Sequence, residues 1–130
     1  MTAINIQRSI DIEETIRSAL APYLTVYCRP LPADFTLPSI LITQVGGSDL
    51  DTIDTFEVVL DARAEHEEAA NLLLRNAIGI LKAVSRGRSK ISYVQVNSSG
   101  SWGRDPARPD LAMCSARLRI TAHLENVTLT

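Results

Sequence analysis

Hydrophobic and polar residues alternate most regularly near the C-terminal end of the chain. From residue 112 to residue 124, one side of the alternation is apolar and the other carries arginine, serine, threonine and histidine. Because successive side chains of a strand point to opposite faces, this pattern predicts a long strand with one buried face. The run at 55–62 also alternates, and the run at 39–45 ends at Gly46 and Gly47. These two runs are expected to be antiparallel neighbours joined by an acidic loop.

Two segments repeat their hydrophobic residues with the period of a helix instead. The first has Ser9 or Asp11 as its N-cap, with Asp11 at capping-box spacing from Glu14, and Pro22 forces it to end near residue 20. The second, residues 64–87, has a broad apolar stripe, with acidic residues at its start and cations near its end. Both segments are therefore predicted to be amphipathic helices.

The remaining residues form short extended runs and proline-rich loops. Extended runs are expected at 25–29 and 91–99, and loops at 30–38 and 101–110. The second loop contains the only tryptophan, Trp102. The resulting order, α-β-β-β-α-β-β, predicts an α+β fold in which two helices pack on one face of a mostly antiparallel sheet.

Composition sets the class of protein. The chain is 45% hydrophobic and 22% charged, which is enough for one domain, residues 1–130, without metal or disulfide support. Cys28 and Cys114 lie in apolar runs, which favours reduced thiols and a cytosolic protein over a disulfide. No stretch approaches about 18 apolar residues, so no membrane partner is expected. The net charge of −2 gives no reason to expect a specific nucleic-acid partner.

The polar residues do not form a pattern with known chemistry. His66 and His123 lack metal-ligand spacing with the cysteines. Asp49, Asp51 and Asp54 resemble part of a calcium loop, but the glycine and the glutamate that should follow are missing, so a solvated acidic loop is expected. Phosphate-binding, hydrolase and metalloprotease motifs are absent. We therefore expect no enzyme activity, no cofactor and no catalytic or metal-binding residue.

Charge is distributed unevenly along the chain. Residues 1–68 carry twelve acids and four arginines, a balance of −8, whereas the rest carries nine cations and three acids, a balance of +6. If these charges lie on different faces, copies attract one another head to tail; if folding interleaves them, the asymmetry disappears. The candidate partners across a subunit boundary are an acidic set (Asp49, Asp51, Asp54) and a basic set (Arg86, Arg88, Lys90).

Trp102 allows two interpretations. Its indole either covers the sheet of its own domain or anchors an interface, where tryptophan and arginine are enriched among the residues that dominate binding. In the second case, Arg104 and Arg108 would reach acidic groups of a neighbour.

The order of these pieces resembles the tail terminator proteins of long-tailed bacteriophages. The resemblance extends from about Leu37 to Leu124 and rests on three segments: "LPSILITQVGG", "DTFEVVLDARAEHEEAANLLLRNAIGIL" and "SGSWGRDPARPDLAMCSARLRITAHL". They place a proline before a strand that ends in Gly-Gly, run a strand straight into an Ala-rich helix, and put a Trp loop with Asp-Pro before the closing strand.

The resemblance implies a structural virion protein. Such proteins form a ring, commonly a hexamer, that caps the head-proximal end of the tail tube, halts its polymerisation and joins it to the head. The implied partners are further copies of the chain, the tail tube protein and the head connector or stopper protein, after assembly in the host bacterial cytoplasm. A connector or stopper protein, and a small-ligand-binding α+β module, are the alternatives.

If Trp102 is an interface anchor, Trp102→Ala will abolish ring assembly or tube capping while the monomer stays folded. Light scattering and circular dichroism of the variant measure both properties. Unfolding would support a covering role within the domain, and normal assembly would rule out the anchor.

Overall fold

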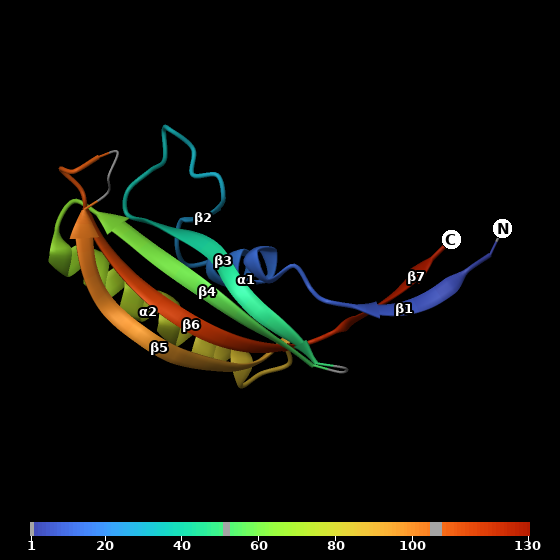
Figure 1. Ribbon diagram of the computed structural model, residues 1–130. Helices are drawn as coiled ribbons and strands as arrows, with labels where there is room; N and C mark the ends of the chain where they lie inside the picture. The colour runs from blue at the N-terminus through green and yellow to red at the C-terminus, as the bar shows by residue number, and fades with distance from the viewer. Residues whose placement is uncertain (1, 51–52, 105–107) are drawn as a thin grey trace.

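The computed structural model describes residues 2–50, 53–104 and 108–130 (Figure 1). Within these ranges the chain forms two helices and seven strands. In chain order the elements are β1 (Ile4–Arg8), α1 (Ile12–Leu20), β2 (Val26–Cys28), β3 (Ser39–Leu50), β4 (Ile53–Ala64), α2 (Glu67–Ser85), β5 (Ile91–Arg104), β6 (Ala112–His123) and β7 (Glu125–Leu129). The two terminal strands, β1 and β7, are additions to the predicted order.

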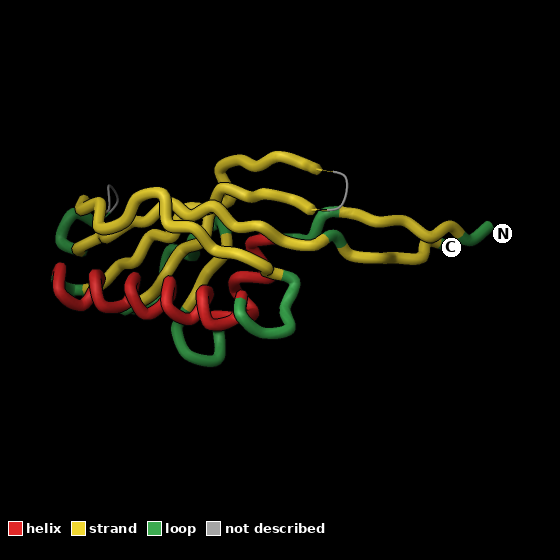
Figure 2. Tube along the Cα trace, turned by 90° about the horizontal axis from the view of Figure 1, so that it is seen from below, coloured by secondary structure: helices red, strands yellow, loops and turns green. Residues whose placement is uncertain are grey.

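Five strands form the main sheet, in the order β2-β3-β4-β6-β5. Neighbours are antiparallel, except that β2 runs parallel to β3. Figure 2 shows α1 and α2 together on one face of this sheet. The predicted α+β class, with two helices on one face of a mostly antiparallel sheet, is confirmed.

The core lies between the helices and the sheet, and β4 shows how it is built. Every second residue from Phe56 to Ala64 is buried, and most residues between them are only partly covered on the open face. Each helix adds one buried stripe, made of Ile12, Ile16 and Leu20 in α1 and of Ala70, Leu73, Leu74, Ala77 and Leu81 in α2. Burial of one large aliphatic side chain stabilises by about 1.5–3 kcal/mol. The helical period and the strand alternation therefore meet in one apolar layer.

The start of α1 confirms the capping pattern of the sequence. The carboxylate of Asp11 accepts a hydrogen bond from the backbone N–H of Glu14 at 3.2 Å. Glu13 and Glu14 lie in the first turn, where negative charge stabilises a helix. The helix ends at Leu20, two residues before Pro22.

The carboxylate of Glu13 in α1 is hydrogen-bonded to the backbone of β3 beside a bulge in that strand. The strand does not end near Gly46 but continues to Leu50, with a register shift between Gln44 and Gly46. Glu13 accepts hydrogen bonds from the backbone N–H of Gln44 at 3.1 Å and from Arg29 at 2.6 Å. Burial alone would raise the pKa of Glu13, but these hydrogen bonds and the charge of Arg29 outweigh it, so the pKa lies below its usual value.

The strand β5 is also longer than predicted. It continues to Arg104, so the backbone of Trp102 lies in a strand opposite Cys114, and the predicted loop is wrong for residues 101–104. Residues 108–110 do lie outside helices and strands. Irregular registers between Val96 and Ser101 accommodate the Ser- and Gly-rich part against β6. The side chain of Trp102 lies outside the described residues.

Glu13→Gln should destabilise the chain by about 1–2 kcal/mol at pH 7, because it weakens a charge-assisted hydrogen bond at a mostly buried group. The pKa of Glu13 is lowered in the folded state, so this stability is present above the unfolded pKa and is lost as the pH falls through the folded value. Urea unfolding at pH 7 and at about pH 3 measures the difference.

Glu14→Gln is the matched control, since Glu14 occupies the same helical turn but pairs with Arg17 at the surface. We expect a smaller change for this variant. Equal losses for the two variants would contradict the role of Glu13.

Candidate functional site

Of the acidic residues singled out in the sequence, Asp54 lies at the same end of the main sheet as the basic residues. Ala122 of β6 is paired with Asp54 on one side and with Ile91 on the other. Asp54 in β4 and Ile91 in β5 are therefore two strand spacings apart, about 10 Å. Asp49 is at the end of β3 but its side chain is outside the described residues, and Asp51 lies outside them altogether.

Asp54 does not lie in a solvated loop. It is the second residue of β4, and its side chain is 2% exposed. Among the described residues, neither of its carboxylate oxygens has a hydrogen-bond partner. The sequence carried the signal for this, because Asp54 continues the buried alternation of Phe56 and Val58 toward the N-terminus. A polar residue on the apolar side of an alternation marks a buried polar group.

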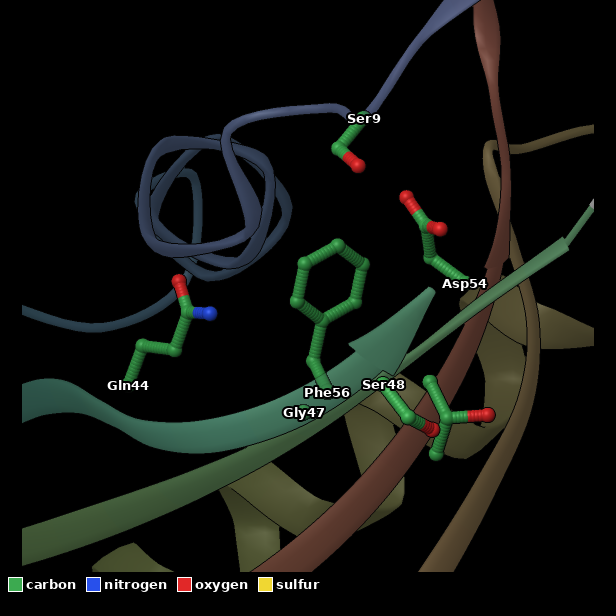
Figure 3. Close-up of a pocket in the computed structure, with 7 residues that line it drawn as sticks. Ser9, Gln44, Gly47, Ser48, Asp54 and Phe56 are labelled. Carbon is green, nitrogen blue, oxygen red and sulfur yellow. The ribbon is translucent and has the colours of Figure 1, made fainter. Parts of the chain in front are cut away.

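Asp54 faces a pocket of about 200 Å³ at the end of the core. The pocket is lined by Ser9, Gln44, Gly47, Ser48, Asp54, Thr55 and Phe56. Figure 3 shows the carboxylate of Asp54 and the hydroxyl of Ser9 pointing toward one another beside the ring of Phe56. Three segments build this pocket: the link between β1 and α1, the far part of β3, and the start of β4.

All three basic residues are exposed, and Lys90 also forms an ion pair. Arg86 ends α2 and Arg88 follows it in the turn, and both are exposed. Lys90 instead contacts Glu125 at 3.4 Å, and Arg8 contacts the same carboxylate at 2.8 Å. The hydrogen bond from Arg8, helped by Lys90, lowers the pKa of Glu125. Of the three basic candidates, Arg86 and Arg88 are thus the better placed to reach another molecule.

Folding brings some acidic residues of the first half of the chain into contact with basic residues of the second half. On the open face of the sheet, Glu57 of the acidic half contacts two cations of the basic half, Arg119 at 3.4 Å and Arg117 at 3.8 Å. These pairs are partly exposed, so each adds little stability, but they neutralise charge within one copy. Other charges stay exposed, among them Glu67, Glu68 and Arg75 of α2.

Arg104 and Arg108 lie at the opposite end of the sheet from Asp54. Arg104 is the last residue of β5 and is paired with Ala112, the first residue of β6. Arg108 is exposed and donates to Asp110 at 3.2 and 3.3 Å, which lowers the pKa of that carboxylate. The structure thus brings two sets of candidates to one end and the tryptophan-associated arginines to the other.

The sequence analysis missed a ribbon formed by the two ends of the chain. β1 pairs antiparallel with β7, from Ile4 opposite Leu129 to Arg8 opposite Glu125. Figures 1 and 2 show this ribbon extending away from the main sheet. Ile4 is 57% exposed and Leu129 is 44% exposed. Both strands alternate in the sequence, but no local turn signals that residues so far apart pair.

Comparisons with protein-family models and with curated proteins found no relative of this chain. No family model matches the chain, and no curated protein is similar to it. In the described ranges, no helix is long and apolar enough to cross a membrane. Among those same residues, no group of three or more His, Cys, Asp or Glu side chains is arranged to hold a metal ion.

Gly47 is the position at which the pocket wall tolerates no side chain. A Cβ added there would lie 2.6 Å from the carbonyl oxygen of Thr55. Gly47→Ala should therefore lower the free energy of unfolding by about 1–3 kcal/mol, measured by urea unfolding. Gly46→Ala is the control, because its added Cβ comes no closer than 3.8 Å to Glu57. Similar losses in both variants would contradict this steric explanation.

Proposed function

We propose that this chain is a ring-forming structural protein of a bacteriophage tail, of the tail terminator kind. In this role, copies of the chain close into a ring on the head-proximal end of the tail tube, stop its growth and present a surface to the head connector. The order of sequence segments from Leu37 to Leu124 supports this proposal, and the α+β fold is compatible with it.

The terminal ribbon is the observation that carries the proposal. A two-stranded ribbon is at best marginally stable alone in water, because it has no layer against which to bury its apolar side chains. Polar side chains of the two strands contact each other. Thr128 donates a hydrogen bond to Asn5 at 2.7 Å, and Arg8 forms an ion pair with Glu125. Ile4 and Leu129 nevertheless stay exposed. Docking on another copy would bury them.

The strand β5 offers a complementary surface for such docking. It is one of the two edge strands of the main sheet and is 14 residues long. An open strand edge can pair with an extended segment of another chain. The ribbon and the β5 edge are different surfaces of one copy, so a joint between them is heterologous and repeats from copy to copy. A repeating joint that closes gives a ring.

Replacing the exposed apolar residues of the ribbon tests this function. In the variant with both Ile4→Ser and Leu129→Ser, we expect self-association to weaken about tenfold or more, because two aliphatic side chains no longer become buried. Light scattering across protein concentrations and negative-stain imaging measure assembly. Mixing with purified tail tube subunits then measures the length of the tubes formed.

Leu72→Ser is the matched control, since Leu72 is 51% exposed on α2, away from the ribbon. It should assemble and limit tube length as the wild type does. Tubes of unlimited length in the presence of the wild type would contradict the terminator function. Binding to head portal rings without an effect on tubes would assign the chain to the connector or stopper class instead.

A further inference from the structure

The pocket at Asp54 lacks a counter-charge within the described residues. Its carboxylate is almost fully buried and has no hydrogen-bond partner among them. An ionised carboxylate in this environment is costly unless it is paired. Arg8, which precedes Ser9, and Lys90, which precedes Ile91 of β5, both contact Glu125 instead. Within the described residues, the carboxylate of Asp54 therefore has no cation beside it.

The other lining residues specify what kind of cation fits. Phe56 and Gln44 line this pocket, and the hydroxyl of Ser9 lies across from the carboxylate of Asp54 (Figure 3). An aromatic face attracts organic cations, and hydroxyl and amide oxygens accept N–H donors. Divalent metals typically take several carboxylate and carbonyl oxygens, whereas this lining holds one carboxylate and a ring.

We infer that the pocket binds a guanidinium or primary ammonium group, with Asp54 as its counter-ion and Phe56 as its aromatic wall. Such a group comes either from a free organic amine or from an arginine side chain of a second copy. The exposed Arg86 and Arg88 lie at the same end of the molecule as the pocket. Two copies meeting at this end can each place such a side chain in the other's pocket, an isologous contact distinct from the ribbon joint.

Agmatine, which carries one guanidinium and one ammonium group, is the probe for binding. At about ten times its Kd, it should raise the Tm of the dilute wild-type chain by about 4–7 °C beyond a sodium chloride control of equal ionic strength. In Asp54→Asn this increase should disappear, while the Tm without agmatine should stay unchanged or rise, because a buried carboxyl group without a hydrogen-bond partner has been replaced by an amide.

Asp61→Asn is the matched control, because Asp61 lies in the same strand but accepts a hydrogen bond from Ser115 on the open face. It should keep the response to agmatine. No response in the wild type, or an equal response in Asp54→Asn, would overturn the inference. Should Asp54→Asn fail to fold, amide NMR shifts of the wild type decide: agmatine must perturb Ser9, Gln44 and Phe56, and shifts confined to other residues overturn the site.

Sedimentation of the wild type and of a variant with both Arg86→Gln and Arg88→Gln identifies the source of the cation. Weaker self-association of the variant, together with competition by agmatine in the wild type, assigns the pocket to a second copy. Unchanged association with agmatine still bound assigns it to a free amine. Agmatine binding is measured on the monomer, so its outcome is independent of whether the chain forms rings.

Discussion

The pairing of β4 with β6 is the contact on which the rest of the structure depends. The two strands run antiparallel from Ile53 opposite His123 to Ala64 opposite Ala112, with no irregularity in the register. Both strands bury every second residue on the same face, so together they provide the apolar surface on which α2 packs. Where α2 begins, this surface is made of small side chains, which allows close packing between helix and sheet. They are Ala62 and Ala64 of β4 and Ala112, Cys114 and Ala116 of β6.

The same constraint makes Asp54 unusual. Once the register of β4 is fixed by Val58, Leu60 and Ala62, the side chain of Asp54 must lie on the buried face, whatever its polarity. The segment between β1 and α1 then covers that end of the core and places Ser9 across from the carboxylate (Figure 3). The buried face of β4 is thus apolar except at Asp54, near its start.

The surfaces available for assembly are located at the margins of the sheet. The open face pairs much of its charge internally through Glu57, Arg117 and Arg119. The ribbon of β1 and β7, the edge of β5 and the end that carries Asp54 remain. The ribbon leaves the main sheet at the end that carries Asp54, whereas β5 forms one of its side edges (Figure 1).

Both helices and the strands β4 and β6 were predictable from the sequence, because period, capping and alternation are local properties that the burial of one face imposes. The pairing of β1 with β7 was not, since it joins residues at opposite ends of the chain without a turn between them. Nor was the extension of β5 past Trp102, because glycine and serine accept a strand only when a partner such as β6 is present. By itself the sequence determined which face of each element is apolar. Only the tertiary structure decided which polar residues share a pocket, as Ser9 and Asp54 do, because that depends on contacts between segments distant in the chain.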